Sequence, residues 1–459
     1  MTNADQQGAM NRMRMTLQLR DGFVRLAHAS ADVVEQTVLA DLKLLVEHAR
    51  TRVPYYQQLL GHISDVNSYE SSEQLLAALP ILTRSQVQEN LDALQFREPG
   101  LNPNLYEGQS TSGSTSKPVT VFKFAPLYAL EYDAITLMDW ELSHRKTNSR
   151  IATFRAVEYD ADEAPLGPPL SYVGHTNTSV VRSVFTHSIP ELLNDLHQAK
   201  PEIFYVNGVV LRQMVQEQLG GGYPDIYIDQ ILTVSDRIDG QLRELTRQAF
   251  GGRINDRYSS EEFGYIALQC TTHDHLHSVH PSVYVEIVDD NNQPCAIGEQ
   301  GRVLVTSLHN MAQPMIRYEI GDIAVRGAEC DAEMKWPVIE NIVGRTRDGV
   351  TLPDGSFHLV SFFDAPFLEI RNLRDFQIVL FDNAIVFLYA GINNLSQSQE
   401  ATIASTLSSV FALERKVVCR RMAPDTWQGK WKRREWDRGI GVYAPGMTDE
   451  QVLGSIATV

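Results

Sequence analysis

The segment Gln109–Pro118 has the residue types of a phosphate-binding loop. Its sequence, QSTSGSTSKP, places hydroxyl side chains on both sides of one glycine and ends in a lysine and a proline. Such a loop offers backbone N–H groups and hydroxyls to a polyphosphate. It is not a Walker A loop, because Ser114 stands where that motif needs its lysine. Phosphate binding is one interpretation, and a flexible serine-rich loop is the other.

The segment Tyr258–Gly264, YSSEEFG, carries an aromatic ring, two hydroxyls and two carboxylates before a glycine. A carboxylate in this setting can hold Mg²⁺, which usually takes one or two protein carboxylates together with phosphate oxygens. The alternative is a helix N-terminus with acidic residues in its first turn. The segment therefore predicts either a metal site or a capped helix.

Three further segments are each weak alone. They are Arg317–Asp322 (RYEIGD), Gly344–Asp348 (GRTRD) and the Gly429-Lys430 pair within GKWKRR. An acidic residue after a glycine is typical of turns, and a run of basic residues is typical of a solvated face. These three segments indicate a function only when their order along the chain is considered together with the two segments above.

Composition limits the classes of protein that these segments can serve. The chain has 459 residues, 43% of them hydrophobic and 21% charged, which is typical of a globular protein of two or three domains. Its net charge of −17 argues against nucleic-acid binding through the phosphate backbone. The four cysteines include no CxxC pair, so we expect a reducing, cytoplasmic setting rather than a disulfide framework.

No segment predicts a signal peptide or a membrane span. The first 20 residues are polar and lack an apolar core. The densest apolar stretch, Ala384–Ile392, is far shorter than the about 20 residues that cross a bilayer. We therefore expect no membrane partner, while the sequence leaves the oligomeric state open.

The elements that must position these segments follow from hydrophobic periodicity. Residues 1–100 are predicted to be largely helical, with one apolar face at Val34, Val38, Leu42, Leu45 and Ala49. Capping boxes are predicted at Ser71 with Gln74 and at Thr83 with Gln86. We interpret this region as a packing layer rather than a catalytic one.

From Ile151 onward, short apolar runs alternate with helical patterns, which indicates an α/β fold. Alternation on either side of the turn Asp289–Pro294 predicts a β-hairpin. A Gly/Asp-rich segment at 344–355 suggests a boundary near Asp348. The expected organisation is a large N-terminal domain, 1–347, with mixed sheets, followed by a small mobile α/β domain, 348–459.

Taken together in this order, the motifs resemble the adenylate-forming enzyme superfamily, most closely its phenylacetate–coenzyme A ligase branch. The resemblance covers nearly the whole chain. Ser112–Pro118 resembles the phosphate loop TSGTTGKP, Tyr258–Gly264 resembles YGSTE-x-G, and Pro314–Asp322 closely resembles PxxRYxxGD. Arg52–Tyr56 and Leu79–Arg84 look like N-terminal signatures of the branch.

The resemblance implies ATP and Mg²⁺ as cofactors and a role for each matched residue. Tyr258 would stack on adenine, Asp322 would bind the ribose with Arg345 nearby, and Glu262 would hold Mg²⁺. Lys430 would enter the site during adenylation, with Lys432 as the alternative, and Asp348 would be the hinge of the C-terminal domain. The remaining ATP or AMP contacts implied are Ser112, Gly113, Ser114, Thr115, Lys117, Ser235, Asp236, Ser259 and Ser260.

The activity implied is a ligase that converts a small carboxylic acid and ATP into an acyl-adenylate and pyrophosphate. The acyl group then passes to a nucleophile, most simply coenzyme A. An amine or amino acid acceptor, giving an amide, stays open because Ser116, Ser235 and Asp236 depart from the family pattern. A carrier-protein thiol is a third acceptor, and a non-catalytic nucleotide sensor is an alternative of another class. By analogy, the acid would bind near Phe154, Val206, Asn207 and Gly208.

Some members of the family carry a structural zinc ion where this chain has four histidines, at positions 273, 275, 277 and 280. This chain keeps Cys270, His277 and Cys330, but Ala332 replaces the last cysteine of that site. Because structural zinc takes four protein ligands, His273 or His275 would have to substitute. The alternative is that these histidines are ordinary polar loop residues.

Overall fold

The computed structural model describes most of the chain. The described residues are 3–110, 118–155, 157, 159–165, 173–234, 238–332, 334–346, 349–351, 357–359, 370, 373–380, 384–391, 393–411, 416–421 and 436–438. They form two compact units. Unit 1 comprises Met1–Ser149, Pro165–Asn177 and Asn255–Val343, and unit 2 comprises Arg150–Ala164, Thr178–Ile254 and Gly344–Val459. The predicted domain boundary at 347–348 lies outside the described residues.

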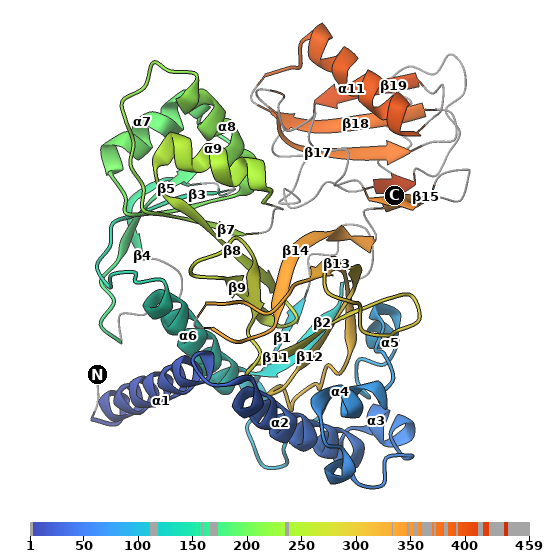
Figure 1. The fold of residues 1–459 in the computed structure, drawn as a ribbon. Helices are drawn as coiled ribbons and strands as arrows, with labels where there is room; N and C mark the ends of the chain where they lie inside the picture. The colour runs from blue at the N-terminus through green and yellow to red at the C-terminus, as the bar shows by residue number, and fades with distance from the viewer. Residues whose placement is uncertain are drawn as a thin grey trace. The chain divides into compact units, whose positions relative to one another are not determined.

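The N-terminal region of unit 1 is helical, as predicted (Figure 1). Its helices are α1 (Asn3–Ala27), α2 (Ala31–Arg52), α3 (Pro54–Leu59), α4 (Ser72–Ala77) and α5 (Arg84–Glu89), with short 3-10 turns at Val66–Ser68 and Pro103–Leu105. The predicted apolar face of α2 is buried. Thr83 and Gln86 form a complete capping box. At Ser71 only half of the box forms, because the Gln74 side chain accepts from the N–H of Glu70 instead.

Strands of unit 1 form a largely antiparallel sheet region, and α6 (Ala125–Leu142) packs against its strand β9. Its strands, in spatial order, are β11 (Val283–Val288), β12 (Gln300–Ser307), β13 (Tyr318–Arg326), β14 (Val338–Arg345), β10 (Leu276–Ser278), β9 (Gly264–Gln269) and β8 (Arg253–Ser260). The predicted hairpin is confirmed, since β11 pairs with β12 in antiparallel register. A separate hairpin, β1 (Tyr106–Ser110) with β2 (Thr120–Phe124), brackets residues 111–117.

Unit 2 contains the α/β region that the alternating pattern predicted. Its strands β3 (Ile151–Arg155), β5 (Thr178–Ser183), β6 (Ile203–Val206) and β7 (Gln230–Val234) pair in parallel, and β4 (Ala161–Pro165) forms the edge. Figure 1 shows α7 (Ile189–Ala199), α8 (Gly208–Leu219) and α9 (Gly240–Phe250) grouped beside these strands. A buried apolar cluster that includes Phe154, Phe204 and Leu211 joins the two layers.

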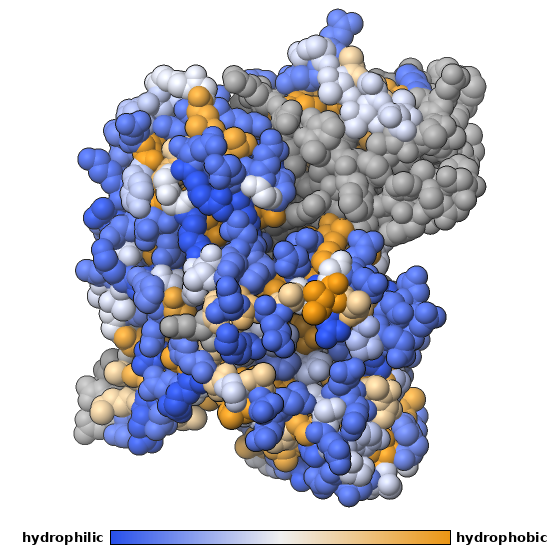
Figure 2. Space-filling model, in the orientation of Figure 1, coloured by the Kyte–Doolittle hydropathy of each residue, from blue (hydrophilic) through white to orange (hydrophobic). Residues whose placement is uncertain are grey.

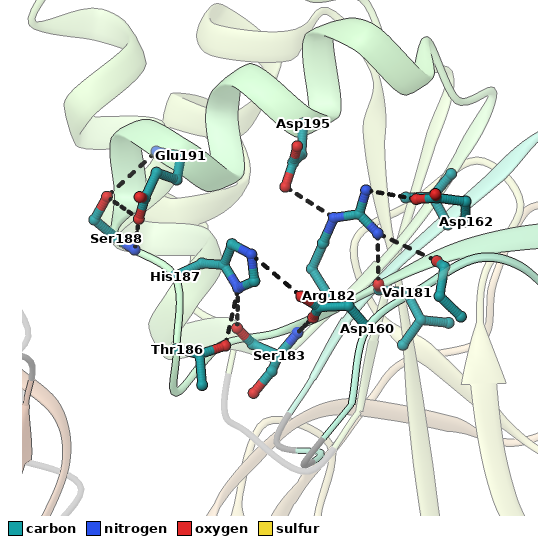
Figure 3. Close-up of polar contacts among 12 residues, drawn as sticks. Asp160, Asp162, Val181, Arg182, Ser183, Thr186, His187, Ser188, Glu191 and Asp195 are labelled. Carbon is teal, nitrogen blue, oxygen red and sulfur yellow. Dashed lines mark hydrogen bonds and ion pairs between the residues drawn. The ribbon is translucent and has the colours of Figure 1, made fainter.

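Arg182 holds the edge strand β4 in place (Figure 3). Its guanidinium lies 2.9 Å from Asp162 on the β4 edge and 2.9 Å from Asp195 on α7. Nearby, His187 lies 3.4 Å from Asp160 and also contacts the carbonyl of Ser183. These contacts tie an edge strand to its neighbours, and we interpret the group as structural.

The C-terminal part of unit 2 is a smaller α/β arrangement. Four strands lie in the order β19 (Lys416–Arg421), β18 (Ala384–Gly391), β17 (Leu373–Leu380) and β20 (Trp436–Arg438), and α11 (Gln397–Phe411) packs on them. Phe376, Phe387, Ile403 and Leu407 form its core. A short hairpin, β15 (Gly349–Thr351) with β16 (Phe357–Leu359), precedes it.

The surface is mainly hydrophilic, as expected for a globular protein of this composition. On the face shown in Figure 2, hydrophilic residues cover most of the coloured surface and hydrophobic ones gather in small groups. Among the described residues, no helix combines the length and the apolar character needed to cross a membrane.

Candidate active site

The motif Tyr258–Gly264 forms the turn between two antiparallel strands. β8 ends at Ser260 and β9 begins at Gly264, so the alternative of a helix N-terminus is wrong. The reason is the backbone of Gly264, whose φ of +75° lies in the left-handed region. A Cβ atom there would also lie 3.0 Å from the hydroxyl of Tyr128. Glycine is therefore required where the turn meets α6.

Tyr258 and Asp322 lie against each other although 64 positions separate them in the sequence. The Tyr258 hydroxyl donates to Asp322 Oδ2 at 2.6 Å. Asp322 is buried within β13, while the Tyr258 ring is half-buried. The structure thus brings together the two residues to which the resemblance assigns adenine and ribose. Ser259 is exposed beside them, and Ser260 Oγ accepts from the N–H of Phe263 at 3.2 Å.

Glu262 is a largely buried carboxylate in the turn between β8 and β9. It is 7% exposed, and no hydrogen bond or ion pair to another described residue holds its side chain. Burying a charge is costly, and the electrostatic interaction with the buried Lys123 ammonium offsets only part of this cost. A hard cation would remove that cost, because it binds carboxylate oxygens directly. The residue therefore fits the predicted role of Mg²⁺ ligand.

A cavity of about 280 Å³ opens beside Glu262 within unit 1. Its walls are largely aromatic and aliphatic, with Lys123, Glu131 and His309 among the polar groups. Glu131 accepts hydrogen bonds from Ser282 and His309, each at 2.7 Å. Burial opposes the charge on His309, but Asp41 and Glu131 raise its pKa to about 10. His309 is therefore a cation that is already paired.

Lys123 is the polar residue of this region that sequence reasoning missed. It lies on β2 with 3% of its surface exposed. The period-two pattern of TVFKF contained a signal, because Lys123 shares the buried face of Val121. Burial lowers the pKa of Lys123 to about 8, against the effect of Glu261 and Glu262.

The predicted segment Arg317–Asp322 is held by the N-terminal layer. Arg317 has a φ of +49°, and its buried guanidinium binds Glu286 through two hydrogen bonds and the Leu79 carbonyl at 2.8 Å. Leu82 pairs with Arg317 and Glu319 through backbone hydrogen bonds. The Tyr56 hydroxyl donates to the Pro314 carbonyl at 3.0 Å. The two N-terminal signatures therefore support the segment that carries Asp322.

Helix α6 contacts both strands of the Tyr258–Gly264 turn, in part through a buried ionic group. Asp139 Oδ2 lies 2.5 Å from Arg257, the residue before Tyr258, and 2.5 Å from Arg145. Tyr132 of α6 stacks on Tyr265 with ring centroids 4.7 Å apart. The ion pair holds β8 against α6, and the ring stacking holds β9 against the same helix.

The cysteine and histidine residues gather in unit 1, near the ends of β9 and β10. Ligand atoms of Cys270, His275, His277 and Cys330 all lie within 4.8 Å of one another. His277 Nδ1 contacts the Trp336 carbonyl at 2.8 Å, so its Nε2 faces the cluster. The Nε2 atoms of His275 and His277 are buried and have no hydrogen-bond partner in the described part of the chain. Two thiols and two imidazole nitrogens are a donor set of tetrahedral zinc.

The four residues assigned to the acid pocket lie at the end of β6 and on β3. Phe154 and Val206 are buried in the core cluster of unit 2. The side chain of Asn207 accepts from the N–H of Val210 and caps α8, and Gly208 is the first residue of that helix. Their role in acid binding stays a prediction. Arg345 ends β14 and is half-buried.

The other predicted site residues lie outside the described residues. They are Ser112, Gly113, Ser114, Thr115, Lys117, Ser235, Asp236, Asp348 and Lys430. The structure describes the two strands, β1 and β2, that lead into and out of the predicted phosphate loop. The hydroxyls of Ser110 and Thr120, at the facing ends of β1 and β2, lie 2.8 Å apart.

Comparison with known proteins gives a structural match only. No protein-family model matches the chain, and no curated protein matches it. Solved structures of 2-hydroxyisobutyryl-CoA ligase match the chain in fold. The complex with 2-HIB-AMP in the postadenylation state matches with a TM-score of 0.64 and 15% identity, over 89% of this chain and 90% of that chain. The complex with 2-HIB-AMP and CoA in the thioesterification state matches with a TM-score of 0.57 and 15% identity, over 90% and 91%. The chain therefore has the fold of 2-hydroxyisobutyryl-CoA ligase, which confirms the predicted fold class.

Proposed function

We propose that this protein is an ATP-dependent ligase that activates a carboxylic acid as an acyl-adenylate and transfers the acyl group to coenzyme A. The observation that carries the proposal is the Tyr258–Asp322 pair. Both residues lie in unit 1 with the buried carboxylate of Glu262, in the fold shared with an acyl-CoA ligase.

The chemistry follows from the charges involved. The acid's carboxylate attacks the α-phosphate of ATP and pyrophosphate leaves; the acceptor thiol then attacks the acyl carbonyl of the adenylate, the acyl–sulfur bond forms and AMP leaves. Catalysis of this kind consists mainly of positioning and of stabilising charge on phosphate oxygens. Asp322 would accept hydrogen bonds from the ribose hydroxyls, while the Tyr258 ring would lie against adenine. Mg²⁺ bound at Glu262 would neutralise phosphate charge. The hydroxyls of the 111–117 loop and Lys430 would complete the site, with Asp348 as hinge between the two half-reactions.

Coenzyme A is proposed as the acceptor because the matched ligase has been solved with CoA in its thioesterification state. An amine acceptor remains the alternative for this chain. Coenzyme A carries several phosphates, so its site needs local basic residues. Lys432, Arg433 and Arg434 are the proposed group, because the chain as a whole is acidic.

The test is to measure ATP consumption over a panel of carboxylic acids, each supplied with coenzyme A or with amino acids. Products are resolved by mass. We expect AMP, pyrophosphate and an acyl-coenzyme A with at least one acid. An acyl-amide without any thioester would mean that the acceptor is an amine and not coenzyme A. Nucleotide binding without turnover of any acid would favour a non-catalytic nucleotide sensor.

Replacing Glu262 with glutamine is expected to raise the Mg²⁺ concentration needed for half-maximal activity. A neutral amide is a poorer ligand for a hard cation than a carboxylate. Loss of an outer-shell partner already costs about 10-fold or more in metal affinity, so loss of the ligand itself should cost at least that. The measurement is a Mg²⁺ titration of pyrophosphate release.

The matched control is Glu107→Gln, which removes one exposed carboxylate from the neighbouring hairpin strand β1. It should leave the Mg²⁺ titration unchanged. A Glu262→Gln variant with the wild-type Mg²⁺ requirement would remove Glu262 from the metal site.

We propose further that Cys270, His275, His277 and Cys330 bind one zinc ion, with His275 taking the place of the cysteine that Ala332 replaces. The two buried Nε2 atoms without partners support this. Burial opposes ionisation of Cys270, yet His277 and Thr272 lower the pKa of its thiol well below the usual value. The ion would link β9 and β10 to the segment that carries Cys330 and so stabilise unit 1.

Protein purified without added metal is expected to contain one zinc ion per chain by elemental analysis. Cys330→Ser should lose the ion and lower the melting temperature. The control Cys295→Ser changes another buried cysteine, whose thiol donates to the Gln300 carbonyl outside the cluster, and should keep the zinc. Substoichiometric zinc in the wild type would leave these histidines as polar loop residues.

A further inference from the structure

The position of the Glu262 carboxylate depends on the backbone of its turn. No described side chain donates a hydrogen bond to the carboxylate, although the Lys123 ammonium interacts with it electrostatically, so the backbone between Ser260 and Gly264 largely sets where it lies. One local hydrogen bond, from the Phe263 N–H to Ser260 Oγ, closes the turn on itself at 3.2 Å. A contact within the turn cannot fix its place relative to the rest of unit 1. A long-range anchor is needed for that.

Lys123 provides the long-range anchor. Its ammonium donates to the backbone carbonyl of Glu261 at 2.8 Å and to Gln109 Oε1 at 2.7 Å. The same nitrogen lies 3.8 Å from the centroid of the Tyr128 ring, within the range of a cation–π contact. One buried group therefore joins β1, β2, the start of α6 and the turn.

The cost of burying this lysine indicates that its contacts matter. An ammonium is costly to bury unless its hydrogen bonds are satisfied. Lys123 lies on the same side of β2 as Val121, a position that an aliphatic side chain would fill without this cost. The two hydrogen bonds and the ring satisfy the three donor directions of the ammonium.

The strands β1 and β2 are also the frame of the 111–117 loop. Gln109 is the penultimate residue of β1, directly before that loop. By binding Gln109 and Glu261 at once, Lys123 couples the frame of the loop to the residue before Glu262. A metal ion that bridges a protein carboxylate and nucleotide phosphates needs these two parts at a fixed separation.

We propose that Lys123 is a positioning residue that fixes the Glu261–Glu262 turn to the β1–β2 hairpin, so that the Glu262 carboxylate meets the metal–nucleotide complex. The inference rests on the proposed function, since it takes Mg²⁺ and ATP as the ligands. It assigns to Lys123 an effect on metal affinity through the turn, without contact with the metal. Outer-shell partners of this kind typically change metal affinity by about 10- to 100-fold.

The experiment measures Mn²⁺ binding in the presence of ATP by the EPR signal of free Mn²⁺, alongside the melting temperature. Lys123→Met keeps an unbranched apolar side chain and removes the charge and donors, and should weaken Mn²⁺ binding by about 10- to 100-fold. Lys123→Arg restores donors and charge and should recover most of the affinity. The control is Arg243→Met, which removes another buried cation, one that donates to the Ile254 carbonyl in unit 2. It should lower the melting temperature and leave Mn²⁺ binding unchanged.

The outcomes separate this inference from the proposed function. Wild-type affinity for Mn²⁺ in a folded Lys123→Met variant would overturn the role of Lys123 alone. A wild-type protein that binds no Mn²⁺ with ATP would contradict the proposed function and, with it, the premise of this inference. If Lys123→Met does not fold, Gln109→Leu decides, because it breaks the same link from the β1 side. It should weaken Mn²⁺ binding by a smaller factor, and unchanged affinity would overturn the inference.

Discussion

Lys430→Ala is expected to slow acyl-adenylate formation by about 10²–10³. The resemblance assigns this lysine to the charge that develops on the carboxylate and the α-phosphate, and loss of one preorganised electrostatic contact has an effect of that size. Transfer of the acyl group from preformed acyl-adenylate should stay largely intact, because that step would use the other orientation of the C-terminal domain. The measurement pairs ATP–pyrophosphate exchange with single-turnover transfer.

Lys432→Ala is the matched control for this prediction. Lys432 carries the same charge two positions later, in the same basic segment. If Lys432→Ala slows adenylation while Lys430→Ala does not, the roles of the two lysines are exchanged. If both half-reactions fall equally in Lys430→Ala, the lysine supports the fold rather than the chemistry.

The sequence was informative where local patterns decide the structure. The apolar face of α2 and the capping box at Thr83 follow from spacing along one helix, and both form as predicted. The turn at Tyr258–Gly264 shows the limit of such patterns. Two acidic residues after serines satisfy the rules for a helix start, yet the left-handed φ of Gly264 and the pairing of β8 with β9 produce a strand turn. Tertiary pairing outweighed the local signal.

Contacts between distant residues were beyond local pattern analysis. The Tyr258–Asp322 hydrogen bond could be expected only through the resemblance, because motif spacing says nothing about distance in space. The link from Lys123 to Glu261 spans 138 positions and depends on how β2 packs beside the turn. Whether His273 or His275 lies beside the cysteines likewise depends on how the loop that carries these histidines folds. The structure gathers ligand atoms of Cys270, His275, His277 and Cys330, and it also places His273 Nδ1 3.6 Å from Cys270 Sγ and 3.5 Å from Cys330 Sγ.

Asp139→Asn is expected to destabilise unit 1 by about 3–5 kcal/mol. The substitution keeps the shape of the side chain but leaves Arg145 and Arg257 without their buried counter-charge. The carboxylate is 8% exposed, and the Arg145 and Arg257 side chains are 1% and 8% exposed, so water cannot replace it. Because Arg257 precedes Tyr258, the loss should also loosen the strand that carries the motif. The measurement is chemical denaturation followed by a probe within unit 1.

The control for Asp139→Asn lies on the same helix. Glu141→Gln breaks an exposed pair with Arg20, whose atoms lie 3.0 Å apart, and pairs of this kind contribute about 0–1 kcal/mol. The pH dependence gives a second check. Burial raises the pKa of Asp139, but Arg145 and Arg257 lower it further, so the folded-state pKa is below its usual value. Above about pH 5 the carboxyl is ionised in both folded and unfolded chains, so the destabilisation should be the same at pH 5 and pH 8 and should shrink as the pH falls below the unfolded pKa of about 4 toward the lower folded-state pKa. A difference that disappears between pH 8 and pH 5 would mean that another group, and not the charge of Asp139, carries the stabilisation.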